Sequence, residues 1–455
     1  MAAEAYTVVD ATLDGRHYAA ASTSAIGNVS SRPQSGLPIA LQRLLHKKSA
    51  PLQIISMPSA VTCSFVAEGS ANAVFCVTPA DDIANTASGS EVGIVHEGTG
   101  ASAESGPLST HLLRIPKAGP GVSPTTCIEH HAYYCTVLRP LLGAEWLVGQ
   151  HLIQGVVSSG VDDILNSLLA DLDRSHRTRP DWVGTRVAAN VDVALLVEDM
   201  TSACKSSPFP STTTTIQCKP KWLVQSPSAP AGARRCRTCA LAAASAAPSG
   251  AIGANGRSSH AKKASPHKIK PCPLVLVADR PTTPQEEAVL DAALWDYVCQ
   301  HMSSAVTSSS SSSSSTPSMA LRKARPAIVH WLRTTDLFLR MAAIQADFDP
   351  RGALSMSLDS PATDDGVSAL ALDRLQIAMT LRDCTCFLRV TTEDDPAPSQ
   401  PALVSAKLGD LDRKNGRHKL AQWQEQERIL LAGGFYLGTE EPRQQTQCWL
   451  ERRQS

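Results

Sequence analysis

Four polar or low-complexity stretches divide this chain, and they limit the fold more than any other feature of the sequence. They are residues 1–57, 78–110, 240–266 and 303–318, the last of which contains an unbroken serine run. Such segments bury too little apolar surface to offset the entropy lost on ordering them. We therefore expect a mostly disordered leader and three disordered insertions, with a core assembled from segments far apart in the chain.

Composition narrows the class of protein. The 455 residues suffice for two or three domains, and 43% of them are apolar. Lys+Arg and Asp+Glu are both 42, so the formal charge is zero, and no nucleic-acid partner is expected. No apolar run reaches the ~18 residues that cross a bilayer, and the N-terminus does not resemble a secretory signal. We expect an intracellular protein, away from membranes, with thirteen reduced cysteines.

The remaining segments alternate between strand and helix patterns. Strands are predicted within 61–77, on both sides of a glycine turn, and at 111–115, 191–200 and 212–224. Helices are predicted over 128–176, 286–302 and 325–345, then from 372 into a turn and strand ending at 390, and again from about 420. This order, with antiparallel-looking strand pairs early in the chain, favours an α+β fold.

The segment Glu68–Asn72 places a glycine turn between two strand-forming runs. Such a turn lets backbone N–H groups approach a phosphate closely, although an ordinary hairpin turn has the same pattern and is the more common case. Arg114 lies within a predicted strand, where a guanidinium needs an anionic partner. A structural ion pair and a nucleotide phosphate both satisfy that need.

Lys219 and Lys221 follow a Thr-rich strand, and a period of two places both side chains on one face. Two like charges side by side favour an anion between them, whereas a solvated edge strand is the alternative. Cys236 and Cys239 form a Cys-x2-Cys pair. A zinc site would need a second ligand pair; His260, His267 and Cys272 are the nearby candidates. Their spacing matches no strong pattern, so unliganded thiols are favoured.

Two acidic motifs lie near the end of the chain. Asp383 sits at a predicted helix-to-strand turn, and Asp410 opens the sequence Asp-Leu-Asp-Arg-Lys. One carboxylate that accepts a proton, a later one that holds Mg²⁺, and lysines nearby are what phosphoryl transfer requires. A surface loop with salt bridges explains residues 410–414 equally well.

Taken in order, these motifs resemble the inositol-pentakisphosphate 2-kinase family. No single motif is specific, whereas ten collinear matches are. They are AEGSAN (67–72), LLR (112–114), PLLG (140–143), RVAANVD (186–192), LLVED (195–199), QCKPK (217–221), CRTC (236–239), CPLVL (272–276), RDCT (382–385) and DLDRK (410–414).

The resemblance implies a kinase-like fold of two lobes with ATP between them. The N-terminal lobe would span residues 58–200, and the C-terminal lobe, with the inositol-phosphate site, residues 201–450. The reaction would transfer the γ-phosphate of ATP, with Mg²⁺, to the 2-hydroxyl of inositol 1,3,4,5,6-pentakisphosphate, giving inositol hexakisphosphate. A monomeric protein of the cytoplasm, the nucleus or both is expected.

The resemblance also assigns roles by position. The residues covering the ATP phosphates would be Glu68, Gly69, Ser70, Ala71 and Asn72, with Arg114 on the nucleotide phosphates and Asp199 near the adenine and ribose. The residues holding inositol phosphates would be Arg186, Lys221, Arg237 and Lys414. Lys219 would bridge the transferring phosphate and the substrate, Asp383 would accept the hydroxyl proton, and Asp410 would bind Mg²⁺.

The chain departs from the family pattern at some positions. Gln217 replaces an expected Glu, and the family's paired asparagines are not visible where the serine run lies. One alternative is therefore a weak or inactive kinase-fold protein that binds inositol phosphates or a protein partner. Another is a non-enzymatic adaptor that holds zinc at the Cys-x2-Cys pair. An active kinase is preferred because both acids and both lysines of the central motifs are present.

Overall fold

The chain forms two compact units, one of residues 1–19 and 24–211 and the other of residues 20–23 and 212–455. The computed structural model describes the following residues: 6–9, 52–79, 108, 110–175, 182–201, 213–247, 271–302, 319–357, 365–392 and 402–454. The serine run and residues 80–107 lie outside them. In the described part of the chain, no helix is long and apolar enough to cross a membrane.

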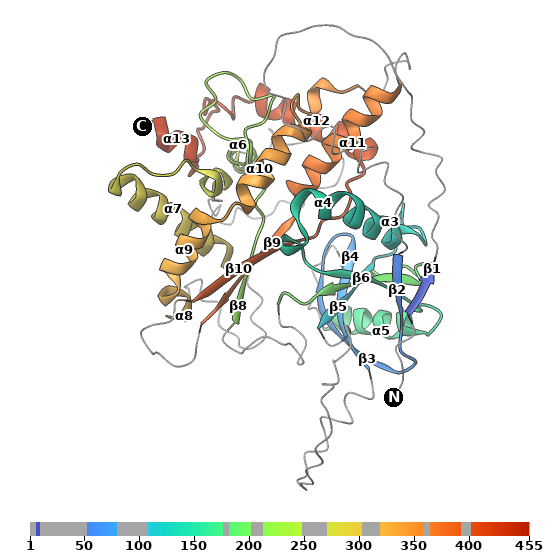
Figure 1. Cartoon of the computed structure of the whole chain (residues 1–455). Helices are drawn as coiled ribbons and strands as arrows, with labels where there is room; N and C mark the ends of the chain where they lie inside the picture. The colour runs from blue at the N-terminus through green and yellow to red at the C-terminus, as the bar shows by residue number, and fades with distance from the viewer. Residues whose placement is uncertain are drawn as a thin grey trace. The chain divides into compact units, whose positions relative to one another are not determined.

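The first unit is built on a seven-stranded sheet with the order β1-β2-β6-β7-β5-β4-β3 (Figure 1). Among the strand pairs of the described residues in this sheet, β2–β6 is parallel and the others are antiparallel. Its strands are β1 (Tyr6–Val9), β2 (Leu52–Ser56), β3 (Val61–Glu68), β4 (Asn72–Pro79), β5 (His111–Pro116), β6 (Gln150–Gln154) and β7 (Val193–Glu198).

Helices cover both faces of this sheet. The amphipathic helix α5 (Val161–Arg174) buries Val161, Leu165 and Leu169 among apolar side chains of the sheet. On the opposite face, α3 (Thr126–Tyr133) contributes Cys127 to a second apolar cluster. A π-helix (Tyr134–Leu138) and α4 (Arg139–Leu142) continue α3, and a short 3₁₀ turn (Ala144–Trp146) follows. The inner strands β5 and β7 are thus largely buried, whereas β3 at the edge of the sheet alternates between partly buried and exposed residues.

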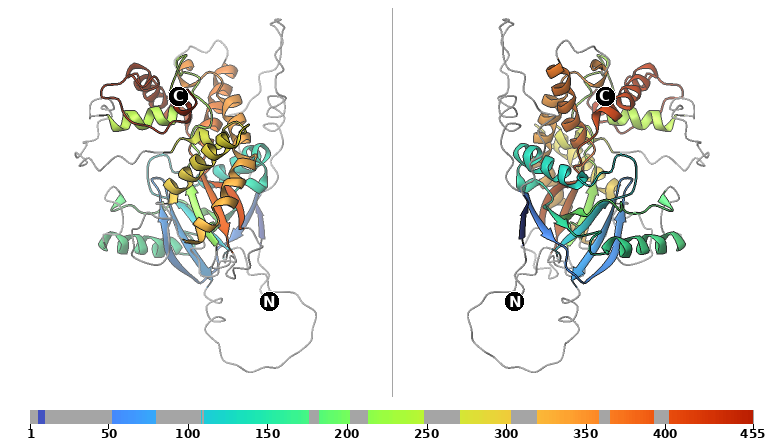
Figure 2. Two further views of the ribbon diagram at one scale, coloured as in Figure 1. Left: turned by 90° about the vertical axis from the view of Figure 1, so that its left-hand side faces the viewer. Right: turned by 90° about the vertical axis from the view of Figure 1, so that its right-hand side faces the viewer.

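The second unit contains a three-stranded antiparallel sheet with the order β10-β9-β8. The strands are β8 (Thr213–Cys218), β9 (Thr385–Thr391) and β10 (Leu403–Gly409). Around it lie α6 (Arg237–Ala246), the 3₁₀ segment η5 (Pro273–Val277), α7 (Pro284–Met302), α8 (Met319–Lys323), α9 (Arg325–Thr334), α10 (Leu337–Phe348), the 3₁₀ turn η6 (Ala353–Ser355), α11 (Asp365–Leu381), α12 (Gly416–Ala432) and α13 (Trp449–Gln454) (Figure 2).

The α+β class predicted from the sequence is confirmed, with both sheets and their helices in place. Residues 1–57, expected to be a mostly disordered leader, contain β1 and β2, and the short apolar run at 52–56 pairs with β6 and buries Ile54. Other local expectations are wrong. The expected helical stretch 128–176 is interrupted by β6.

The low-complexity stretch expected from residue 240 is helical up to Ala246, since alanine is the strongest helix former and its small side chain packs closely. Ala240, Ala243 and Ala244 are buried against Leu430 and neighbouring aromatic rings. The expected helix 325–345 is two helices, α9 and α10, separated at an extended Thr335. The expectation of reduced cysteines holds for the free thiols of the described residues but is wrong at Cys76, which is disulfide-bonded.

Candidate functional site

The three-stranded sheet of the second unit brings distant charged residues to one edge. Strands β8 and β10 run in the same direction and β9 runs against them, so the ends of β8 and β10 lie beside the start of β9. Cys218 pairs with Cys386, and Gly409 pairs with Thr385. Lys219 and Asp410 directly follow these strands, and Asp383 lies two residues before Thr385. The three are therefore neighbours at this edge, although they are up to 191 residues apart.

Asp383 is the centre of this edge. Its carboxylate accepts hydrogen bonds from Nζ of Lys221 at 3.1 Å and from Nζ of Lys414 at 2.9 Å, one on each oxygen. Lys219 donates to the backbone oxygen of Asp383 at 2.9 Å and to Oδ2 of Asp410 at 3.1 Å. Nζ of Lys219 is also 3.9 Å from the Asp383 carboxylate, so this ammonium lies between the two acids. We call these five residues the lysine–aspartate cluster.

The lysines control the charge of Asp383. Burial alone would raise the pKa of Asp383, but the hydrogen bond from Lys414 and the charges of Lys414, Lys221 and Lys219 outweigh that effect. The net result lowers the pKa from 3.8 to about 2, so the carboxylate is ionised at neutral pH. Asp410 is 43% exposed and Asp383 is 48% exposed, so both acids are accessible to a ligand.

Two members of the cluster have backbones that L-amino acids rarely adopt. Among the described residues, Lys221 with φ 57° and Asp410 with φ 54° are the non-glycine residues with positive φ. Each such residue costs on the order of 1 kcal/mol or more and persists only where its surroundings fix it. Strain of this kind concentrates at functional sites, and here both examples belong to one charged cluster.

Neighbouring side chains and one close backbone contact hold the segments that carry the three lysines of the cluster. Gln345 of α10 is fully buried, and its amide donates to the Lys221 carbonyl at 3.0 Å while its oxygen accepts from the Leu223 N–H at 2.9 Å. The hydroxyl of Tyr297 on α7 donates to the Lys219 carbonyl at 3.3 Å. Near Lys414, a Cβ on Gly416 would lie 2.8 Å from Gln376 Cγ, so a glycine lets this segment approach α11 closely.

Sequence reasoning did not identify Gln345 or Tyr297. The available signal for Gln345 was one amide within the largely apolar stretch 337–348. Its partners lie more than 120 residues away, so the sequence does not show which backbone it holds.

The structure does not bring Arg237 to the lysine–aspartate cluster. Its guanidinium is buried, its Nε donates to Glu427 at 2.8 Å, and its Cζ lies 4.4 Å from the centre of the Trp222 ring. Glu427 also accepts from Ser226 at 2.6 Å and from the hydroxyl of Tyr436. In this arrangement Arg237 is part of the protein's internal bonding.

The expected glycine loop is the turn of the β3–β4 hairpin. The Gly69 N–H donates to the Asn72 carbonyl at 2.8 Å, and Gly69, Ser70 and Ala71 are exposed. The Glu68 side chain instead is buried and forms an ion pair with Lys117, whose Nζ lies 4.4 Å from the centre of the Trp182 ring. Lys117 directly follows β5, and sequence reasoning, which considered only Arg114 in this part of the chain, missed it.

The other expected nucleotide and substrate residues of the first unit are spread over its elements. Arg114 lies mid-strand in β5, opposite Val74 on one side and Leu195 on the other. Asp199 is buried and accepts from the backbone and hydroxyl of Thr201 at 2.8 and 2.9 Å. Arg186, by contrast, forms a partly exposed ion pair with Asp173 at 3.1 Å.

The chain was also compared with known proteins. The sequence profile described as inositol-pentakisphosphate 2-kinase matches residues 65–429. The chain belongs to this family. Members of the inositol-pentakisphosphate 2-kinase family are phosphotransferases, and the lysine–aspartate cluster lies within the matched region. A search of curated proteins found no match. The resemblance inferred from the ordered motifs is thus confirmed.

Proposed function

We propose that this 2-kinase family member transfers the γ-phosphate of ATP to the 2-hydroxyl of inositol 1,3,4,5,6-pentakisphosphate and produces inositol hexakisphosphate. The family match supports an inositol-phosphate kinase in general. The specific reaction is supported by one observation above all: three lysines converge on the accessible carboxylate of Asp383.

The cluster has the charge that a polyphosphate needs. Three ammonium groups and two carboxylates leave a local charge of +1, in a chain whose total is zero. When the phosphates of the substrate pair with Lys221 and Lys414, each exchanges a partly exposed ion pair for a charge-assisted hydrogen bond to phosphate. Lys219, which lies between the two acids, is placed to contact the transferring phosphate.

Asp383 is the proposed proton acceptor. The oxygen of the substrate hydroxyl attacks the γ-phosphorus, the bond from that phosphorus to the β–γ bridging oxygen breaks, and ADP leaves with the electron pair. The hydroxyl proton passes to the carboxylate of Asp383. As substrate phosphates draw Lys221 and Lys414 away, the pKa of Asp383 rises from its low value, so the carboxylate becomes a better base where the substrate is bound.

Asp410 is the proposed Mg²⁺ ligand. Mg²⁺ in kinase sites takes one or two carboxylates together with phosphate oxygens, and Asp410 would provide one such carboxylate. The ion, when bound, neutralises charge on the transferring phosphate. The backbone of Asp410 at positive φ aims its side chain from the end of β10 toward Lys219.

We further propose that the two units are the lobes of a kinase-like fold. The first unit would supply the nucleotide contacts, through the turn at Glu68–Asn72, Arg114 and Asp199, and Arg186 would hold an inositol phosphate. Arg237 would reach the substrate only if it exchanged Glu427 for a phosphate.

The test is a transfer assay with radiolabelled ATP, Mg²⁺ and inositol pentakisphosphate, with the product position assigned by nuclear magnetic resonance. Asp383→Asn is expected to lower kcat by about 10²–10⁴-fold, the usual contribution of a positioned base. Asp373→Asn is the matched control, because that carboxylate forms a comparably exposed pair with Arg413 in the same unit. Its kcat is expected to stay unchanged.

The outcomes separate the hypotheses. Substrate binding by calorimetry without turnover of the wild-type protein would replace the proposal with a binding protein that lacks catalysis, and Gln217 on β8 would be the first residue to change to Glu. Turnover that survives Asp383→Asn would overturn the assignment of the base. Absence of both binding and turnover would overturn the proposed reaction itself.

A further inference from the structure

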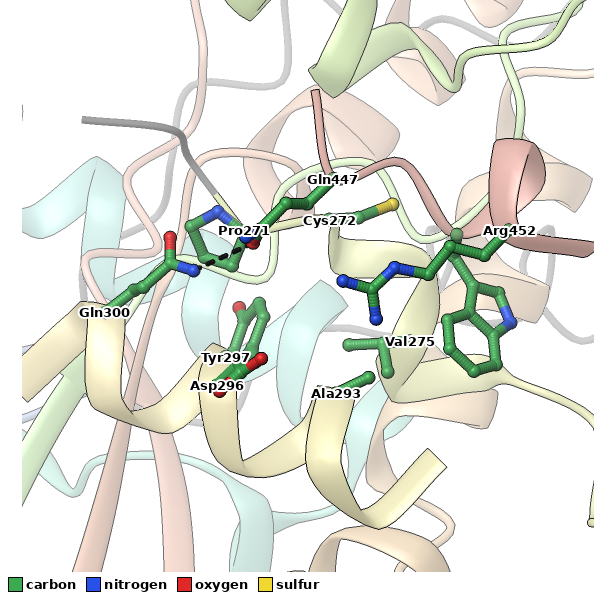
Figure 3. Close-up of a pocket in the computed structure, with 10 residues that line it drawn as sticks. Pro271, Cys272, Val275, Ala293, Asp296, Tyr297, Gln300, Gln447 and Arg452 are labelled. Carbon is green, nitrogen blue, oxygen red and sulfur yellow. Dashed lines mark hydrogen bonds between the residues drawn. The ribbon is translucent and has the colours of Figure 1, made fainter. Parts of the chain in front are cut away.

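Two helices of the second unit hold the backbone that carries Lys219 and Lys221. The hydroxyl of Tyr297, on α7, donates to the Lys219 carbonyl at 3.3 Å, and the amide of Gln345, on α10, donates to the Lys221 carbonyl at 3.0 Å. Tyr297 also lines the pocket drawn in Figure 3. Residues 219–223 lie in no helix or strand, so side chains supply the hydrogen bonds that regular structure supplies elsewhere.

Gln345 makes the more extensive of the two contacts. Its side chain is fully buried, and besides donating to the Lys221 carbonyl it accepts from the Leu223 N–H at 2.9 Å. One amide thus bonds the carbonyl of one residue and the N–H of the residue two positions later, as a neighbouring strand would. An apolar side chain at this position would remove a partner from both peptide groups.

This contact bears on the conformation of Lys221. Its φ of 57° lies in the left-handed region, which a residue other than Gly, Asn or Asp rarely adopts. A lysine side chain has no acceptor with which to bond a neighbouring N–H, so it cannot stabilise this backbone by itself. Released from Gln345, the backbone is expected to return to the β or α region. Nζ of Lys221, now 3.1 Å from the Asp383 carboxylate, would then move away from it.

The same turn of α10 also holds the segment of Asp383. Arg382, directly before Asp383, is buried and donates to Asp349 at the end of α10 at 2.5 Å. It also lies 3.5 Å from the backbone oxygen of Gln345. One helix turn therefore anchors both members of the Lys221–Asp383 pair and sets the spacing between them.

Packing alone does not explain a glutamine at this place. A buried amide needs hydrogen-bond partners, whereas an apolar side chain of the same length needs none. The other buried side chains of α10 are apolar: Leu337, Phe338, Met341, Ile344 and Phe348. A purely structural tie is the alternative role for Gln345, and it differs from a functional one in what it predicts for substrate affinity.

We propose that Gln345 is a positioning residue of the phosphoryl transfer. It keeps Lys221 in its left-handed backbone, so that the Lys221 ammonium stands beside Asp383 and is ready to bind a phosphate of the substrate. Gln345 acts only through Lys221 and does not contact the substrate. The assignment rests on the proposed function for its effect on affinity, whereas the position of Lys221 can be measured without substrate.

A double-mutant cycle tests whether Gln345 acts through Lys221. Gln345→Met keeps the length of the side chain and removes both hydrogen bonds. By calorimetric titration, the Kd for inositol pentakisphosphate should rise at least about fivefold in the otherwise wild-type protein, but less than about twofold in the Lys221→Met background. KM should rise in parallel while kcat stays within about threefold, because Lys221 contacts the substrate before and during transfer alike.

A purely structural role gives a different result. Loss of stability alone lowers the amount of folded enzyme and the maximal rate, leaves KM unchanged, and adds to the effect of Lys221→Met without coupling. Gln424→Met is the matched control. The Gln424 amide also donates to backbone carbonyls of the same unit, those of Ala353 at 3.0 Å and Met356 at 2.8 Å. Its Kd and KM should equal those of the wild type.

Lysine labelling measures the position of Lys221 without substrate. Acetic anhydride reacts with the deprotonated amine, so an ion pair with a carboxylate slows the reaction. Acetylation of Lys221 relative to that of Lys419 on α12, followed by mass spectrometry of peptides, should be faster in Gln345→Met than in the wild type. Gln424→Met should leave the ratio unchanged.

Hydrogen exchange covers the case in which Gln345→Met does not fold. The Leu223 N–H of the wild type lies outside the strands, and Gln345 accepts its hydrogen bond. We expect this amide to exchange about as slowly as the amides of β9, because both require opening of the interior.

Three results would overturn the proposal. They are an equal loss of affinity from Gln345→Met with and without Lys221→Met, an unchanged acetylation rate of Lys221, and fast exchange of the Leu223 N–H in the wild type. Failure of the proposed function looks different: the wild type would then bind no inositol pentakisphosphate. In that case the acetylation of Lys221 still shows whether Gln345 holds it beside Asp383.

Discussion

The second unit contains two sets of charged residues that differ in how their charges are matched. In the lysine–aspartate cluster the side chains are 22–48% exposed and the lysines outnumber the acids. In the interior, three arginines each pair with a buried acid, and in these pairs no side chain is more than 5% exposed. These buried pairs are Arg235–Glu440, Arg237–Glu427 and Arg382–Asp349. Arg235 is also 3.5 Å from a second acid, the partly exposed Glu451.

The difference indicates which charges are available to a ligand. A buried guanidinium that pairs with a buried carboxylate has exchanged water for a fixed partner, and separating the two is costly. A half-exposed ammonium that shares one carboxylate with two others loses little when a phosphate replaces that carboxylate. Substrate contacts are therefore expected from Lys219, Lys221 and Lys414, and stability from the buried pairs.

The largest expected effect comes from breaking a buried pair. Arg382 donates to Asp349 at 2.5 Å, and its Cζ lies 3.4 Å from the centre of the Trp222 ring. Arg382→Met leaves the Asp349 carboxylate buried without its cation, so we expect a loss of about 3–5 kcal/mol in the free energy of unfolding. Urea denaturation followed by tryptophan fluorescence measures it.

The control for this prediction removes both charges. Arg382→Met combined with Asp349→Leu should recover much of the lost stability, since an apolar pair needs no charge compensation. If the free energy of unfolding of Arg382→Met lies within about 1 kcal/mol of the wild-type value, the buried pair does not differ energetically from an exposed one. That result would contradict the proposed difference between the buried pairs and the lysine–aspartate cluster.

The next effect concerns binding. Lys221→Met removes one ammonium from the lysine–aspartate cluster, and a charged hydrogen bond to phosphate is worth about 1.5–3 kcal/mol. We expect the Kd for inositol pentakisphosphate to rise about 10- to 150-fold, with the free energy of unfolding changed by less than about 1 kcal/mol. Calorimetric titration and denaturation of the same preparation measure both quantities.

Arg428→Met is the matched control for that variant, because Arg428 is an exposed cation on α12 that pairs with Glu425. Its affinity and its stability should both equal those of the wild type. A loss of affinity equal to that of Lys221→Met would mean that the overall positive charge of the surface, and not the lysine–aspartate cluster, attracts the substrate.

The sequence predicted the members of the lysine–aspartate cluster better than those of the buried arginine–acid pairs. Lys219, Lys221, Asp383, Asp410 and Lys414 could be selected because each lies in a short motif, and the motifs keep a fixed order. Their meeting at one edge then follows from the antiparallel pairing of β8, β9 and β10. Because each of these motifs adjoins an end of a strand, the sequence alone indicates that they lie at the edge of a sheet.

The buried pairs could not be predicted in the same way. Glu427 and Glu440 lie in the last part of the chain, about 190–205 residues from the arginines they neutralise. Which acid meets which arginine depends on helix packing, and no local pattern encodes it. For the same reason Cys448 was not recognised as a neighbour of Cys236, whose N–H donates to its sulfur at 3.1 Å. Gln345 was likewise not recognised as the residue that holds Lys221.

A smaller effect is expected in the pH dependence of stability. The folded pKa of Asp383 is about 2 and its ordinary value is 3.8, so its ion pairs contribute fully above about pH 4. The contribution is lost as the pH falls through 2, because the folded state then binds the proton too. Since the side chain is 48% exposed, solvent screening keeps this term below about 1 kcal/mol.

The measurement compares wild type with Asp383→Asn in urea at pH 5 and at pH 2.5. The wild type should lose slightly more stability than the variant, and 1 M salt should shrink the difference. An unchanged difference in 1 M salt would indicate that the pairs of Asp383 behave like the buried arginine pairs.

The smallest effect on stability is expected at Asp410. Asparagine tolerates positive φ as well as aspartate does, so Asp410→Asn keeps the backbone of this position and changes only the charge. The free energy of unfolding should change by less than about 0.5 kcal/mol. The Mg²⁺ concentration that gives half-maximal transfer should nevertheless rise, because a ligand oxygen has lost its charge.

The Asp410→Ala variant separates the effect on the backbone from the effect on Mg²⁺. Alanine has no polar side chain that could stabilise a backbone at φ 54° by local hydrogen bonds. If Asp410→Asn leaves the Mg²⁺ dependence unchanged while Asp410→Ala destabilises the fold, then Asp410 has a structural role like that of the buried pairs. Asp383 is in that case the single functional acid of the lysine–aspartate cluster.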